Sequence, residues 1–121
     1  MRFLTLVKSA EKAGPPPPAL MGAIAKLGEE AGKAGVMRGM GGCLPSTSGA
    51  RIRLAGGKLR VAEGPFPDAE TIGGWCFWEF PSRKEAIEWS SRFLELHKQH
   101  WPGWEGEVEL RQLFDAPGGA P

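Results

Sequence analysis

The stretch Gly73-Gly74-Trp75-Cys76-Phe77-Trp78-Glu79-Phe80 decides the fold, because a strand of this sequence is apolar on both faces. Successive side chains of a strand point to opposite faces. Trp75 and Phe77 therefore share one face, while Cys76 and Trp78 share the other. A strand that is apolar on both faces needs cover on each side. We expect helices over one face and a second sheet, most economically from another subunit, over the other.

Periodic patterns on either side of this strand predict the other elements. Strands are expected at residues 2–8, 36–44 and 107–114, a hairpin at 51–62, and helices at 19–34 and from 82 to the turn at 101–104. Ser82 and Glu85 form a capping box at the start of the second helix. The order β-α-β-hairpin-β-α-β predicts an α+β fold, a ferredoxin-like antiparallel sheet with two helices on one face plus a β-hairpin.

The hairpin at residues 51–62 is expected to turn at Gly56-Gly57. Its register places Arg53 opposite Arg60 on one side and leaves the other side apolar. Like charges opposite each other are unfavourable. Either the two arginines extend into water, or a carboxylate or anion lies between them.

Glu63 follows the hairpin in the stretch Glu63-Gly64-Pro65-Phe66. Counting by two from Leu59 and Val61 places Glu63 on the apolar face, as an inward-pointing acid. Gly64 is expected to supply backbone angles denied to other residues. Burial disfavours the charged carboxylate unless an arginine or backbone amides meet it. Glu63 is therefore either a general base or an acceptor that locks the turn.

Length and charge restrict the class of protein. A chain of 121 residues and 13.0 kDa is one small domain, near the size at which association adds much of the stability. A net charge of +1 without a basic block argues against nucleic-acid binding. No stretch approaches membrane-spanning length, and Cys43 and Cys76 match no metal or redox pattern. We expect a cytoplasmic protein in which both cysteines are small buried hydrophobes.

His97 and His100 lie three residues apart near the end of the second helix. This spacing can hold a metal, but further ligands would have to come from elsewhere. Histidines in a last turn more often cap the helix or offset its dipole, and Trp101 and Trp104 are expected to pack. We expect no metal and no cofactor.

The chain as a whole resembles the YCII-related family, in its DGPF subgroup. The resemblance is carried, in order, by residues 1–8, 34–36, 42–46, 49–53, 63–66, 72–74, 84–89 and 106–111. It implies a domain over residues 1–114 that pairs sheet to sheet into a dimeric α+β barrel. Residues 115–121, rich in Gly, Pro and Ala, are expected to form a mobile tail. Two features depart from the family: Glu63 replaces the usual aspartate, and residues 67–71 lack a lysine and look shortened.

The resemblance and the residues together leave three functions open. The first is a homodimer that binds a small apolar or aromatic molecule between its sheets. The second is a lyase or isomerase with Glu63 as general base and Arg111 or Arg53 steadying an anion. The third, implied by the family alone, is an accessory protein of an extracytoplasmic-function sigma factor. The candidate ligand-binding residues are Arg53, Phe66, Trp75, Phe77, Glu79 and Arg111.

Catalysis by a His-Asp pair, which the resemblance to some YCII-related lyases would imply, is not expected. That pair requires a histidine in the first half of the chain, and the chain has none before His97.

Overall fold

The computed structural model describes residues 1–66 and 70–114, and the tail predicted at 115–121 lies outside them. Its helices and strands are β1 (Arg2–Ala10), α1 (Pro18–Lys33), β2 (Met37–Gly42), β3 (Ala50–Ala55), β4 (Lys58–Glu63), β5 (Glu70–Glu79), α2 (Arg83–His100) and β6 (Gly106–Gln112). Every predicted element is present. The central strand β5 is longer than predicted, because its pairing with β1 continues to Glu70.

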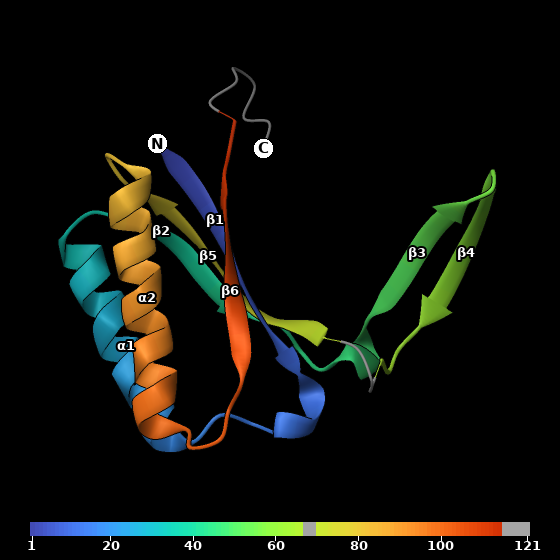
Figure 1. Cartoon of the computed structure of the whole chain (residues 1–121), viewed down its shortest axis with the longest axis horizontal. Helices are drawn as coiled ribbons and strands as arrows, with labels where there is room; N and C mark the ends of the chain where they lie inside the picture. Colours follow the sequence, from blue (N-terminus) through green and yellow to red (C-terminus); the bar gives the residue numbers. More distant parts are fainter. Residues whose placement is uncertain (67–69, 115–121) are drawn as a thin grey trace.

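Four strands form one antiparallel sheet in the order β2-β5-β1-β6. With the hairpin set aside, this is the strand order of a ferredoxin-like fold. Figure 1 shows both helices on the same side of this sheet. The predicted α+β architecture is therefore confirmed, and the opposite side of the sheet carries no helix in the part of the chain that the structure describes.

The hydrophobic core lies between the helices and the sheet. Its buried residues are Phe3, Ala31, Cys76, Trp78, Phe80 and Ala86. Trp78 buries its indole nitrogen by donating a hydrogen bond of 3.0 Å from Nε1 to Thr5 Oγ1, since a buried polar atom needs a partner. Burial raises the pKa of the Cys76 thiol, which keeps it an inert core group.

Helix α2 begins as predicted, because Ser82 Oγ accepts a hydrogen bond of 3.2 Å from the Glu85 amide. The cysteines behave differently from each other. Cys76 is buried, as expected, but Cys43 is exposed, because it follows the end of β2 in a connection that leaves the sheet. Within residues 1–66 and 70–114, neither helix is long and apolar enough to cross a membrane.

His97 is buried among aromatic rings at the end of α2. Its ring lies 4.8 Å from Phe93 and 4.5 Å from Trp104, between centroids, and Trp101 stacks on Trp104 at 6.0 Å. Nδ1 donates to the Phe93 carbonyl oxygen at 3.0 Å. Burial lowers the pKa of His97 below 6.5, so the neutral ring is favoured. The lowered pKa argues against a charge on His97 that would offset the helix dipole, and the ring instead bonds a carbonyl of the preceding turn. The packing role of the tryptophans is confirmed.

Acidification is expected to destabilise the protein through His97. The unfolded chain takes up a proton at this side chain near pH 6.5, whereas the native chain does so only at lower pH. The contribution of His97 is therefore complete above pH 6.5 and is lost as the pH falls below it, with a slope of at most about 1.4 kcal/mol per pH unit. Urea denaturation at several pH values between 5 and 7.5 measures it. His97→Phe should lose this slope, and the control His100→Gln should keep it.

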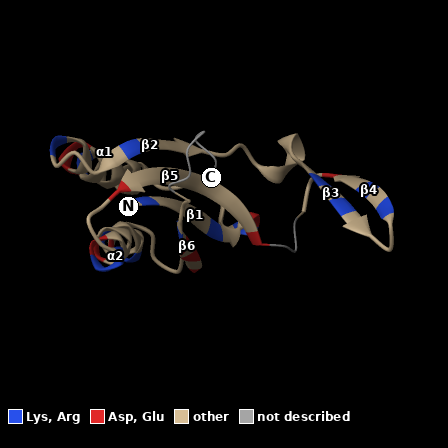
Figure 2. Ribbon diagram, turned by 90° about the horizontal axis from the view of Figure 1, so that it is seen from above, with Lys and Arg blue, Asp and Glu red and all other residues tan. Residues whose placement is uncertain are grey.

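Strands β3 and β4 form a separate hairpin that extends away from the rest of the chain, and we call residues 50–63 the arm. Figures 1 and 2 both show the arm on the side of the sheet opposite the helices. Its register is the predicted one, with Arg53 opposite Arg60 and Leu54 opposite Leu59. All twelve strand residues of the arm are exposed.

Candidate functional site

The side of the sheet opposite the helices is apolar and uncovered. Leu6 lies directly opposite Trp75, and Leu4 lies opposite Phe77. The rings of Trp75 and Phe77 meet edge to face with centroids 5.5 Å apart. Phe77 is 40% exposed, although a core-sized aromatic group is normally covered. We call this surface, made of Leu4, Leu6, Trp75 and Phe77, the open face.

A glycine in β2 makes room for Trp75. A Cβ at Gly41 would lie 2.7 Å from the Trp75 ring, closer than such atoms pack. The indole therefore lies across the backbone of β2 instead of standing up from the sheet. Gly41, which weakens β2 as a strand pattern, thus has a packing reason. It lets the indole of Trp75 lie flat on the open face.

Charged side chains border the open face on the β6 side. Lys8 Nζ donates to Glu109 Oε1 at 2.6 Å, and Arg111 Nη1 donates to Glu109 Oε2 at 3.1 Å. The hydrogen bond from Lys8, followed by that from Arg111, lowers the pKa of Glu109. The same bond to Glu109 raises the pKa of Lys8. Both shifts favour the charged forms of Lys8 and Glu109. Two cations and one carboxylate thus leave a net positive charge beside two aromatic rings.

Two of these three residues were missed from the sequence. Arg111 was a candidate, but Lys8 and Glu109 were not. Both lie on the same face as Leu6 by the alternation of their strands, because Leu6 is opposite Glu109 in the register of β1 with β6. If the first and last strands are assumed to pair, alternation alone places Lys8 and Glu109 on the face of Leu6. Glu79, another candidate, forms an exposed ion pair of 3.5 Å with Arg38 at the far end of β5.

Glu63 is not buried in the chain. The register of the arm does place it on the face of Leu59 and Val61, but nothing in the described residues covers that face. The predicted inward-pointing acid is therefore corrected to an exposed one. The reason is that the arm leaves the domain, which its alternation pattern cannot reveal. Arg53, the other candidate on the arm, is also exposed.

The turn after the arm is locked by a different acid, Glu11. Both carboxylate oxygens of Glu11 accept hydrogen bonds from Ser46, one from its amide and one of 2.6 Å from Oγ. Ser46 Oγ in turn accepts from the Phe66 amide at 2.8 Å. Ser46 is 8% exposed. The lock predicted for Glu63 therefore exists, but Glu11 and Ser46 supply it.

Gly64 is needed at this turn for space. A Cβ there would lie 1.6 Å from the Ser46 carbonyl oxygen. Gly64 does not have a positive φ, so the expected reason, special backbone angles, is wrong. Phe66, beside it, is half-buried, and its ring lies 4.1 Å from the Arg51 guanidinium carbon. This contact holds Phe66 at the base of the arm and away from the open face.

Removing the Ser46 hydroxyl is expected to lower stability. Ser46→Ala leaves the Phe66 amide and one Glu11 oxygen without their partner, and an unsatisfied buried group costs about 1–3 kcal/mol. Urea denaturation measures the loss. Ser48→Ala is the matched control, because Ser48 is exposed in the same 3₁₀ turn. Equal stability of the two variants would contradict the lock.

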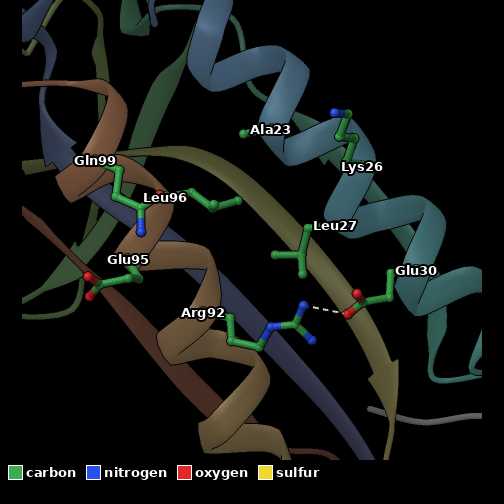
Figure 3. Close-up of a pocket in the computed structure, with 8 residues that line it drawn as sticks. All are labelled: Ala23, Lys26, Leu27, Glu30, Arg92, Glu95, Leu96 and Gln99. Atoms are coloured by element: carbon green, nitrogen blue, oxygen red, sulfur yellow. Dashed lines mark ion pairs between the residues drawn. The ribbon is translucent and has the colours of Figure 1, made fainter.

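A groove lies between the two helices, on the side of the domain opposite the open face. Figure 3 shows this groove of about 360 Å³, lined by Ala23, Lys26, Leu27, Glu30, Arg92, Glu95, Leu96 and Gln99. Arg92 crosses it to form an ion pair with Glu30. It contains none of the candidate residues, and its lining mixes apolar side chains with the stems of long charged ones. The groove is the seam between two packed helices.

The candidate residues thus fall into two groups within one chain. Trp75, Phe77 and Arg111 lie on or beside the open face, with Glu79 at the end of β5. Arg53, Glu63 and Phe66 lie on the arm or at its base. Within residues 1–66 and 70–114, no three His, Cys, Asp or Glu side chains are placed to hold a metal ion.

Comparison with known proteins supports the family assignment. The sequence model of the YCII-related domain matches residues 1–94. This match includes α1, the arm, β5 and most of α2. A search of curated proteins finds no match. The chain therefore belongs to the YCII-related domain family.

Proposed function

We propose that the protein is a homodimer of the DGPF subgroup that pairs its open faces into an α+β barrel and binds a small apolar or aromatic molecule between them. The observation that carries the proposal is the pair of Trp75, half-buried, and Phe77, 40% exposed, on a sheet whose other face packs against the helices. A domain of 121 residues gains much of its stability by covering such a surface. A second copy supplies a surface of the same chemistry.

The subgroup assignment rests on Glu63-Gly64-Pro65-Phe66. Gly64 has no room for a side chain, and the Phe66 amide is held by Ser46. This short stretch therefore fixes the direction in which the arm leaves the domain. The free thiols of Cys43 and Cys76 fit a reducing, cytoplasmic compartment.

The chemistry of the open face selects the class of ligand. Trp75 and Phe77 offer flat apolar contact, which suits a ring or another apolar body. The Arg111 guanidinium shares Glu109 with Lys8 and keeps donors free for a second acceptor. A small aromatic molecule that carries a carboxylate meets both requirements. Pockets of this kind are mostly apolar with a few placed polar groups.

A thermal-shift screen with small aromatic carboxylates tests the proposal. Compounds that raise the melting temperature of the wild type should lose their effect on Trp75→Leu and keep it on Ile87→Ala, an exposed position of α2. A set of compounds that shifts neither the wild type nor any variant would contradict a ligand on the open face.

The same screen separates binding from catalysis. Glu63→Gln removes the only general base that the enzyme hypothesis names. Because Glu63 is exposed on the arm, we expect ligand binding without turnover, unchanged by this substitution. Conversion of a bound compound by the wild type, lost in Glu63→Gln, would instead support the lyase or isomerase.

A further inference from the structure

We propose that the arm of each copy clasps the other copy of the dimer, with the apolar side of the arm against its partner. This inference rests on the proposed homodimer and adds to it. The four apolar residues on one side of the arm are Ile52, Leu54, Leu59 and Val61, which are 70%, 69%, 72% and 67% exposed. An isolated two-stranded hairpin is marginally stable in water, so this side requires cover.

The two sides of the arm differ completely in chemistry. The register pairs Ile52 with Val61 and Leu54 with Leu59 on one side. The other side carries the four cations of the arm, Arg51, Arg53, Lys58 and Arg60. Apolar residues on one face and polar residues on the other are typical of antiparallel strands that pack on one face and meet water on the other. The pattern therefore indicates a protein surface beneath the apolar side.

A second copy is the occupant that the geometry favours. The arm stands on the same side of the sheet as the open face, and Figures 1 and 2 agree on this placement. A copy seated on the open face would lie beside the arm. By two-fold symmetry, its own arm would then flank the first copy. In the clasped dimer, the open face and the apolar side of the arm would contact the same partner.

The position of the arm is set before the partner arrives. Glu11 and Ser46 fasten its base to the end of β1, and Arg51 packs on Phe66. A held arm loses less conformational freedom on binding than a loose one.

The area involved is suitable for a stable dimer. Four aliphatic side chains at this exposure offer roughly 250 Å² of apolar surface per arm. Each copy would bury its own arm and an equal area beneath the other arm, about 500 Å². Stable interfaces bury about 800 Å² on each partner. The open face supplies the remainder.

Charge also favours the encounter of two copies. Residues 50–63 carry four cations and Glu63, a net charge of +3, whereas the rest of the chain carries −2. Figure 2 shows basic residues along both strands of the arm, whereas basic and acidic residues both occur on the helices. Charge separation of this kind steers two molecules together, arm toward body.

The clasp would also unite the two groups of candidate residues. Glu63 lies on the apolar side of the arm, opposite Ala50. In the clasped dimer it approaches the partner, whose Trp75 and Phe77 carry the ligand site.

Nuclear Overhauser measurements on a mixed dimer test the clasp. One copy carries ¹³C-labelled Ile, Leu and Val methyl groups, and the other is unlabelled. We expect cross-peaks between copies from the methyls of Ile52 and Leu54 on the arm and of Leu4 and Leu6 on the open face. The buried Leu20 methyls, which lie in α1, serve as the internal control and should show none.

The possible outcomes separate this inference from the proposed function. Cross-peaks from Leu4 and Leu6 without any from the arm would overturn the clasp and leave the sheet-to-sheet dimer intact. Absence of all cross-peaks between copies would overturn both.

A double variant gives an independent measurement. Leu54→Ser combined with Leu59→Ser should raise the dissociation constant of the dimer at least tenfold, which is about the effect expected when central apolar contacts are lost. Met21→Ser, an exposed residue of α1, should leave it unchanged. The opposite outcome is a dissociation constant that the double variant leaves unchanged, together with binding of the wild type, but not of the double variant, to anionic lipid vesicles. That outcome would assign the arm to a membrane surface and overturn the clasp.

Discussion

Phe77→Glu is expected to convert the proposed homodimer into a folded monomer. Phe77 belongs to the open face, so in the proposed dimer the substitution places one carboxylate from each copy in the apolar interface. Like charges brought together in an interface cost several kcal/mol, and each 1.4 kcal/mol is a tenfold change. The dissociation constant should therefore rise at least about 100-fold. Sedimentation equilibrium measures the change.

The fold should survive this substitution. Phe77 is 40% exposed in the single chain, and the core on the helix side does not include it. Far-ultraviolet circular dichroism of the variant should match that of the wild type. Ile87→Glu is the matched control, because Ile87 is 42% exposed on α2. A dimer that withstands Phe77→Glu as well as Ile87→Glu would place the interface elsewhere.

Gly64→Ala is expected to destabilise the chain by about 3 kcal/mol or more, at the upper end of the effects of overpacking. The added Cβ would lie 1.6 Å from the Ser46 carbonyl oxygen and 2.5 Å from its carbon. These are backbone atoms of a buried residue, so they cannot rotate away. Their displacement would also disturb the hydrogen bonds from Ser46 to Glu11 and from Phe66 to Ser46.

Gly22→Ala provides a control of opposite sign. Gly22 lies in α1, and nothing comes within 4 Å of a Cβ built there. Alanine at this position should stabilise the helix by about 1 kcal/mol. Urea denaturation of both variants gives the comparison. A Gly64→Ala protein as stable as the wild type would show that Glu63-Gly64-Pro65-Phe66 is not the close-packed turn described above.

The architecture could be predicted because local patterns determine most of it. The apolar Cys76 and Trp78 side of the strand around Trp75 predicted the core beneath the helices, and the capping box at Ser82 predicted the start of α2. The register of the arm followed from Gly56 and Gly57, which both have positive φ. In each case the signal lies within a few consecutive residues.

The errors arose where the answer depended on distant parts of the chain. Glu63 was expected to point inward because its face is apolar, but alternation cannot show whether another element covers a face. Glu11 was not identified, because its contact with Ser46 joins residues 35 positions apart. Lys8 and Glu109 were missed for the same reason, since β1 and β6 are the first and last strands. Alternation did correctly predict that Trp75 and Phe77 share one face of the sheet.

The mass of the protein in solution tests the central claim most directly. If a second copy covers the open face, sedimentation equilibrium of the wild type should give twice the chain mass of 13.0 kDa. A single species of 13.0 kDa at every concentration would contradict the account. The open face and the arm would then be surfaces that the protein leaves exposed to water.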